Sequence, residues 1–259
     1  LHGVHAVDAA GVHPLLLAST GEVPADAGCE IHCDPLAPIC RRCKTLLAKD
    51  GDAVAITWLT RDDRYGEKLA TPDVSMADLV GEIDPVKVAE GRYLADEETI
   101  HYGLVPRTNR GLFAINELPD LTEKVQVGLF NLMEEKDIQI KGYKVRLPLD
   151  IVIVASANPA DYTSRARIIT PLKDRFDVQI RTHYPRTVAH EIAIMEQEVP
   201  AADRGTLPVR VPEFMKEILA QLTFEARASN EINQSSGVSV GVTINNYQTL
   251  LSNAGKGAV

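Results

Sequence analysis

Three things are scarce in this sequence: long apolar runs, positive charge, and cysteine outside one short stretch. No hydrophobic segment reaches the ~20 residues that a membrane-spanning helix requires, so no membrane span is expected. The formal net charge is −9, which argues against nucleic acid as a partner because such binding depends on Lys and Arg that neutralise phosphates. The start of the chain lacks the charged region and apolar core of a signal peptide. We therefore expect a cytoplasmic protein.

The remaining composition is that of an ordinary globular protein. The chain has 259 residues, of which 45% are hydrophobic and 24% charged, enough for one large domain or two modest ones. It does not begin with Met and it stops just past a helix-like segment. We therefore expect it to be a piece of a longer protein.

All four cysteines lie in the stretch CEIHCDPLAPICRRC, at Cys29, Cys33, Cys40 and Cys43. The spacing C-x3-C-x6-C-x2-C suits four thiolates around a tetrahedral Zn²⁺, which would then be structural. His32 is an alternative ligand in place of Cys33. A set of loop thiols without any metal is the competing interpretation. The absence of cysteine elsewhere suits a reducing compartment.

Hydrophobic patterns predict strands that alternate with helices from residue 111 onward. Apolar runs at 112–115 and 150–159 are typical of buried parallel strands, and 176–184 is a third candidate strand. Between the first two strands, an amphipathic helix is marked by Val125, Leu129, Leu132 and Met133. Asp120 together with Glu123 resembles an N-cap pair for this helix. Alternation on either side of Lys141-Gly142 predicts a β-hairpin.

The two ends of the chain differ from this middle part. Residues 1–70 are mostly irregular, with a candidate helix at 14–19 and a strand-like segment at 52–60. A helix follows the third strand, and two more are marked after residue 212 by Phe214, Ile218 and Leu222 and by Tyr247, Leu250 and Leu251. We expect an α/β domain with a parallel sheet flanked by helices, then a small C-terminal helical domain. The expected boundaries are 1–70, 71–200 and 201–259.

Polar side chains follow the predicted strands where a parallel sheet binds its ligands. Asn116 and Glu117 end the first strand, and Ser156 and Asn158 end the second. The segment before the third strand carries basic residues at Arg165, Arg167, Lys173 and Arg175. An acid that polarises water, an amide that orients it and a guanidinium that offsets developing charge together suit hydrolysis of a phosphoanhydride.

The order NRGLFAINELPDL, hairpin, ASANP and PLKDRFD resembles the helix-2-insert branch of the AAA+ ATPases. Within this branch it is similar to the magnesium-chelatase ATPase subunits and MoxR-like proteins, over residues 69–198 well and the helical tail loosely. By this resemblance Glu117 is the catalytic carboxylate of the Walker B strand, Asn158 the sensor-1 amide and Arg175 an arginine finger for the neighbouring subunit. The segment LVGEIDPVKVAEGRY is then the helix-2 insertion, and the helical tail is the lid.

The resemblance implies ATP and Mg²⁺ as cofactors, a homo-oligomeric ring of subunits and a client protein that the ring remodels. Asn116, Arg165 and Arg167 are then candidate nucleotide-binding residues, although the two arginines suit solvated charges or a subunit interface equally well.

Three features depart from the family pattern. No Gly-rich loop ends in Gly-Lys-Ser/Thr, and the one Gly-Lys pair is Gly255-Lys256. Asn116 stands where the family usually has the Asp that supports Mg²⁺, and Ser and Gly stand in SSGVSVGVTI where relatives tend to carry a sensor-2 Arg. Three hypotheses follow: an ATPase module, a degenerate AAA+ module that assembles without turnover, and a zinc-stabilised binding module.

Overall fold

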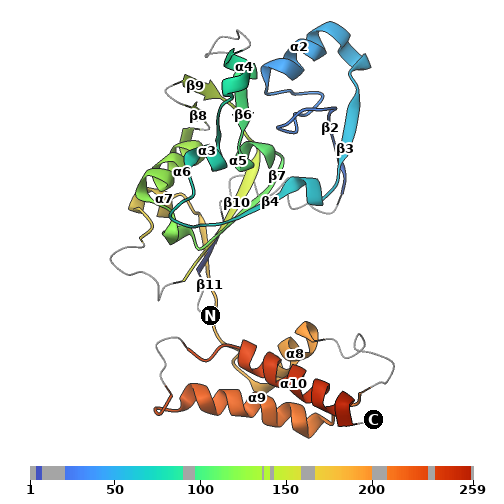
Figure 1. Ribbon diagram of the computed structural model, residues 1–259, viewed down its shortest axis with the longest axis vertical. Helices are drawn as coiled ribbons and strands as arrows, with labels where there is room; N and C mark the ends of the chain where they lie inside the picture. The colour runs from blue at the N-terminus through green and yellow to red at the C-terminus, as the bar shows by residue number, and fades with distance from the viewer. Residues whose placement is uncertain are drawn as a thin grey trace. The chain divides into compact units, whose positions relative to one another are not determined.

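The computed structural model describes residues 4–7, 21–89, 97–135, 137–140, 143–158, 167–199, 209–232 and 237–257. The chain forms two compact units, one made of Val4–Arg181 and the other containing Thr182–Val259 (Figure 1). The second unit thus begins before residue 201, the boundary expected from the linker composition. Within the parts of the chain described here, no helix is both long and apolar enough to cross a membrane.

A five-stranded sheet forms the centre of the first unit, in the order β11-β1-β10-β7-β4. Its strands are β1 (Val4–Val7), β4 (Tyr65–Leu69), β7 (Gly111–Asn116), β10 (Ile151–Ala157) and β11 (Val178–Arg181). β7 pairs in parallel with both β10 and β4, which confirms the predicted parallel sheet. β1 runs antiparallel to β10 and β11, an exception that the sequence did not indicate.

The central strands are buried as their apolar runs predicted. Phe113 and Ile115 of β7 and Ile153 and Ala155 of β10 are at most 2% exposed. The third strand is shorter than the predicted 176–184, since β11 covers only four residues. Among the described residues, β11 lies at the sheet edge and pairs with β1, which has four residues. The number of residues in β11 that can form strand hydrogen bonds is therefore limited.

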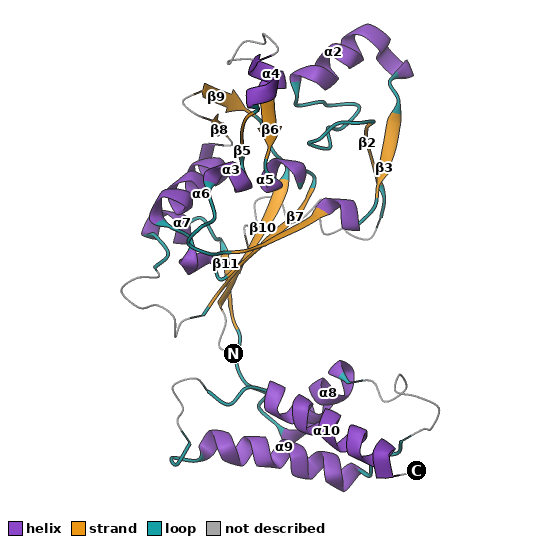
Figure 2. Ribbon diagram, in the orientation of Figure 1, coloured by secondary structure: helices purple, strands orange, loops and turns teal. Residues whose placement is uncertain are grey.

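Helices and small sheets surround these strands (Figure 2). The helices are α3 (Met76–Leu79), α4 (Pro85–Ala89), α5 (Leu104–Arg107), α6 (Glu123–Glu135) and α7 (Thr170–Lys173). β5 (Gly81–Ile83) pairs with β6 (Ile100–Tyr102). The predicted hairpin is present as β8 (Asp137–Ile140) and β9 (Tyr143–Arg146), and its turn at 141–142 lies outside the described residues.

Helix α6 buries Val125, Leu129 and Leu132 as its periodicity predicted. Its predicted cap at Asp120 is wrong, because α6 begins at Glu123 and the carbonyl of Thr122 accepts from the N–H groups of Val125 and Gln126. Asp120 instead ends the 3-10 turn Leu118–Asp120.

The cysteines belong to a small substructure of the first unit. β2 (Val23–Asp26) pairs with β3 (Ile56–Leu59), and α2 (Arg41–Asp50) lies between them in sequence. β3 is shorter than the strand predicted over 52–60 because residues 51–53 form a 3-10 turn. The helix predicted at 14–19 lies outside the described residues.

Within its described residues, the second unit contains three helices: α8 (Val188–Glu198), α9 (Glu213–Ala228) and α10 (Gly241–Gly257). Their core contains Ile192, Met195, Ala220, Tyr247 and Leu251. The helical tail is therefore confirmed, but the apolar stripe that marked α9 faces solvent. Phe214, Ile218 and Leu222 are 54–59% exposed, and α9 instead buries Ala220 and Thr223.

Candidate functional site

The ends of β7 and β10 bring the predicted polar residues together. The two strands are parallel neighbours in register, with Ile115 opposite Ala155. Asn116 therefore ends β7 beside Ser156 of β10, and Glu117 and Asn158 follow at the same edge of the sheet. The carboxylate and the amide occupy adjoining strand ends, as hydrolysis of one bound phosphate would require.

The hydroxyl of Ser156 joins these two ends. It accepts a hydrogen bond from the backbone N–H of Glu117 at 3.1 Å and donates to Oδ1 of Asn116 at 3.4 Å. On the other side of β7, the carbonyl of Asn116 accepts from the N–H of Ala70, just after β4, at 2.7 Å. Three strand ends are thus fixed to one another around Asn116.

Glu117 adopts a left-handed backbone conformation, with φ 57° and ψ 48°. This conformation is strained for a residue other than Gly and tends to occur where function constrains the backbone. It turns the chain from β7 into the 3-10 turn, whose Leu118 and Pro119 are buried. The backbone is therefore anchored on both sides of Glu117, whose side chain is half-buried, while that of Asn116 is exposed.

Arg167 lies near the start of α6, beside a cavity of about 470 Å³ that Asp120 and Glu123 also line. The buried side chain of Gln126 holds this segment: Nε2 donates to the carbonyls of Leu121 and Arg167 at 2.9 Å, and Oε1 accepts from the N–H of Ile169 at 2.8 Å. Sequence reasoning missed this role, because a single Gln within an apolar helix carries no distinctive signal. Arg165 lies outside the described residues.

Arg175 lies apart from the strand ends within its own chain. Its guanidinium pairs with the carboxylate of Glu134 and lies 6.0 Å from the ring centroid of Phe130, both on α6. Glu134 is near the C-terminal end of α6, roughly 16 Å along the helix from Glu123 at 1.5 Å per residue. Among the described residues, the side-chain contacts of Arg175 are therefore with the C-terminal half of α6 and not with Glu117.

The four cysteines form a compact cluster, with all four Sγ atoms within 4.8 Å of one another. Backbone N–H groups donate to three of the sulfurs: that of Cys33 to Cys29 at 3.5 Å, that of Cys40 to Cys33 at 3.4 Å, and that of Cys43 to Cys40 at 3.3 Å. Cys40 also caps α2. Four convergent sulfurs with N–H donors fit a tetrahedral Zn²⁺. His32, the alternative ligand, is not part of this cluster of described residues.

The electrostatics of the cluster favour a cation. Hydrogen bonds from the thiols of Cys33 and Cys40 hold the pKa of the Cys29 thiol far below its usual range. Burial raises the pKa of the Cys43 thiol. The guanidinium of Arg42 lies 4.0 Å from the sulfur of Cys43. A dication bound among the four sulfurs would draw the protons off the remaining thiols.

The cysteine cluster lies at the opposite end of β7 from Asn116. Buried Asn109, just before β7, donates to the carbonyl of Ile31 at 2.8 Å and accepts from the N–H of Asp150, just before β10, at 2.8 Å. Because β7 has six residues, about 20 Å of strand separates the two ends. A metal in the cluster would therefore support the fold and would not reach the candidate catalytic residues.

Comparison with known proteins gives weak but consistent matches in sequence. No family model matches the chain. The archaeal Lon protease of Thermococcus kodakarensis is 24% identical over 145 residues, which is 50% of this chain and 22% of the relative. The magnesium-chelatase 38 kDa subunit of Cereibacter sphaeroides is 27% identical over 101 residues, 38% of this chain and 29% of the relative. The chain thus spans less than a third of either relative.

Among solved structures, a chain from the complex between the BchI and BchD subunits of magnesium chelatase is 21% identical. The match covers 82% of this chain and 61% of that chain, with a TM-score of 0.49. The order of motifs along the sheet and the sequence matches agree: the chain is similar to AAA+ ATPases of the magnesium-chelatase and MoxR-like group.

Proposed function

We propose that the chain is an AAA+ module that binds ATP with Mg²⁺ at the ends of β7 and β10 and couples hydrolysis to remodelling of a partner protein. In this proposal Glu117 polarises the attacking water and Asn158 orients it against the terminal phosphate. The observation that carries the proposal is the hydrogen bond from the N–H of Glu117 to Ser156, which joins the two strand ends. Arg167 and Asn116 are proposed to contact the nucleotide and its Mg²⁺.

The position of Arg175 supports a role across a subunit interface in a homo-oligomeric ring. Its partly exposed side chain is bound to α6 of its own chain, away from Glu117. In a ring, a guanidinium on this side can reach the nucleotide of a neighbouring copy and offset charge in the transition state.

Phosphate release from ATP tests the site. Because the sequence contains no Gly-Lys-Ser/Thr loop, we expect turnover of this chain alone to be far below that of an ordinary AAA+ enzyme. Whatever turnover remains should fall by at least ~100-fold in Glu117→Gln. Glu225→Gln, an exposed acid on α9, should leave it unchanged. Turnover that survives Glu117→Gln intact would rule out this carboxylate as the base.

Mixing two inactive variants tests the role of Arg175. Glu117→Gln copies keep the arginine, and Arg175→Ala copies keep the acid, so a mixed ring contains interfaces that are complete. We expect the mixture to regain turnover that neither variant shows alone. Turnover that stays at background in the mixture, while both variants assemble normally, would place Arg175 outside the reaction.

A second candidate is a degenerate module that binds nucleotide or assembles without turnover. It is supported by the amide at position 116, which carries no charge for Mg²⁺. Asn116→Asp separates the two candidates. In an active module the added carboxylate should strengthen Mg²⁺-dependent nucleotide binding and raise turnover, whereas in a degenerate module turnover should remain at background.

For the cysteine cluster, we propose a structural Zn²⁺ held by Cys29, Cys33, Cys40 and Cys43. The convergent sulfurs and their N–H donors support it. Metal analysis should find one Zn²⁺ per chain, and Cys43→Ser should lower this content. If the purified, reduced protein contains no Zn²⁺ and takes up none, both this proposal and the alternative of a zinc-stabilised binding module are excluded.

A further inference from the structure

Helix α9 has two apolar faces, and the second unit uses only one of them. Ala220 and Thr223 face the core of the unit. Phe214, Ile218 and Leu222, spaced at i, i+4 and i+8, form a second stripe on the surface and are 59%, 54% and 57% exposed. Since the helix already has a buried face, this second stripe is not needed to hold the unit together.

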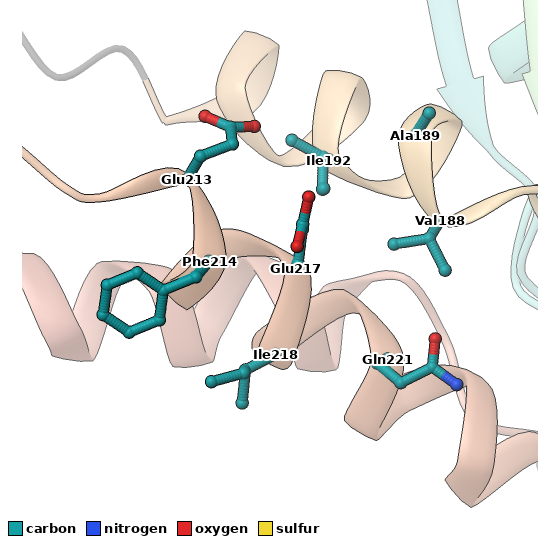
Figure 3. A pocket seen from close by; sticks show the side chains of 8 residues that line it. All are labelled: Val188, Ala189, Ile192, Glu213, Phe214, Glu217, Ile218 and Gln221. Carbon is teal, nitrogen blue, oxygen red and sulfur yellow. The ribbon is translucent and has the colours of Figure 1, made fainter.

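The second stripe borders a groove between α9 and α8. The groove encloses about 660 Å³, with walls formed by Val188, Ala189 and Ile192 of α8 and by Glu213, Phe214, Glu217, Ile218 and Gln221 of α9. Figure 3 shows the carboxylate of Glu217 between the two helices, beside Ile192. The groove is therefore lined by apolar side chains together with Gln221 and the two acids Glu213 and Glu217.

The charge of the groove has one sign. Its two charged lining residues, Glu213 and Glu217, are both acidic. The nearest base on α9, Lys216, is already bound by Glu196 at 2.6 Å and by Glu213 at 2.9 Å. Among the described residues Glu217 has no ion pair, so its charge is available to a cation from outside.

We propose that this groove binds an amphipathic, basic helix of a partner protein. The partner helix would place apolar residues at i and i+4 against Phe214 and Ile218, with a Lys or Arg beside them paired to Glu217. The stripe runs from Phe214 to Leu222 on α9, about two and a half helical turns, which matches a partner helix of about the same length. A second copy of this chain fits less well, because two copies with a formal net charge of −9 repel each other.

Two fluorescently labelled model peptides test the proposal by anisotropy with the full chain. One has leucines at i, i+3, i+4 and i+7 with lysines elsewhere, and the matched peptide has glutamates in place of the lysines. We expect the lysine peptide to bind and the glutamate peptide to bind at least ~10-fold more weakly. Glu217→Lys should weaken binding of the lysine peptide about 10-fold, whereas Glu231→Lys, outside the groove, changes the net charge equally and should leave binding unchanged.

A second pair of variants tests the apolar stripe without altering charge. Ile218→Ser should weaken binding of the lysine peptide, and Val242→Ser, a 42%-exposed apolar residue on α10, should not. Circular dichroism checks that each variant keeps its helices. The proposal is overturned if Glu231→Lys weakens binding as much as Glu217→Lys, or if both peptides bind equally. It is also overturned if the chain dimerises through the stripe, seen as light-scattering mass that Ile218→Ser halves.

Discussion

The backbone N–H of Glu117 donates a hydrogen bond to the hydroxyl of Ser156 at 3.1 Å, and this contact joins the ends of two parallel strands. The same hydroxyl donates to the side chain of Asn116. One serine therefore positions both the candidate catalytic acid and the residue before it. Because Glu117 is held in a left-handed conformation, the direction of its side chain depends on this contact.

Ser156→Ala should therefore affect the site more than the fold. Ser156→Ala removes the two hydrogen bonds of this hydroxyl, to Glu117 and Asn116, and is expected to lower the free energy of unfolding by about 1–3 kcal/mol. Nucleotide binding or turnover should decrease by a larger factor than this loss of stability explains. Urea unfolding and nucleotide binding measure the two effects. Thr45→Ala, which removes a hydroxyl that bonds within α2, is the control and should leave nucleotide binding unaltered.

A second prediction concerns the buried ion pair of the C-terminal unit. Glu191 is fully buried and accepts from Nη1 and Nη2 of Arg227 at 2.7 and 3.0 Å, and from the hydroxyl of Thr243 at 2.7 Å. Glu191→Ala leaves the guanidinium without its anion and should destabilise this unit by about 3–5 kcal/mol. The double variant Glu191→Leu with Arg227→Met should recover most of that loss. Thermal unfolding measures the loss of stability in the single variant and in the double variant. Equal losses in the two would show that Glu191 and Arg227 are not coupled.

Zinc affinity should increase with pH. Metal binding requires thiolates, and burial raises the pKa of the Cys43 thiol, so binding must displace protons. Protons compete more strongly as the pH falls, and the affinity for Zn²⁺ should be lower at pH 6 than at pH 8. Competition with a chromophoric chelator at the two pH values measures the difference. Equal affinities at both would indicate that the thiols are not the ligands.

The capping box at the start of α3 gives a prediction about how stability depends on pH. The N–H of Ser75 donates to the carboxylate of Asp78 at 2.8 Å, and the hydroxyl of Ser75 accepts from the N–H of Asp78 at 3.2 Å. The backbone and hydroxyl bonds from Ser75 lower the pKa of Asp78. A lowered folded-state pKa adds stability above the unfolded pKa, and this stability is lost as the pH falls through the folded value.

Asp78→Asn should therefore destabilise the protein at pH 7 and have little effect at acidic pH where the wild-type carboxyl is protonated. Because Asp78 is exposed, solvent screening keeps the loss at pH 7 to at most about 1 kcal/mol. Urea unfolding at both pH values measures it. A loss of the same size at both would show that the charge of Asp78 is not involved.

Much of the first unit was predictable because its signals are periodic and local. The apolar runs of β7 and β10 and the stripe of α6 required only the spacing of buried residues. That β7 and β10 end side by side, with Glu117 and Asn158 following them, was predictable from a topological rule about parallel strands. The bond between Ser156 and Glu117 was not predictable, since it depends on the exact register of two strands 40 residues apart.

Other features have no local signal. The antiparallel direction of β1 is decided by pairing partners more than a hundred residues away. In α9 the apolar spacing of Phe214, Ile218 and Leu222 correctly indicated a helix but not which side of it is buried. The buried side uses Ala220 and Thr223, because small residues let α9 approach its neighbours closely. The burial of Glu191 likewise depends on Arg227, which lies on another helix.

The separation of the cysteine cluster from the ends of β7 and β10 has a consequence for how amino-acid substitutions affect such a chain. The buried contacts of Asn109 and the sulfur atoms secure one end of the strands, while at the other end the side chain of Asn116 is exposed. We therefore expect that exchanging an amide for an acid at this exposed position costs little stability, so that the chemistry of the strand ends can change through substitution without loss of the fold.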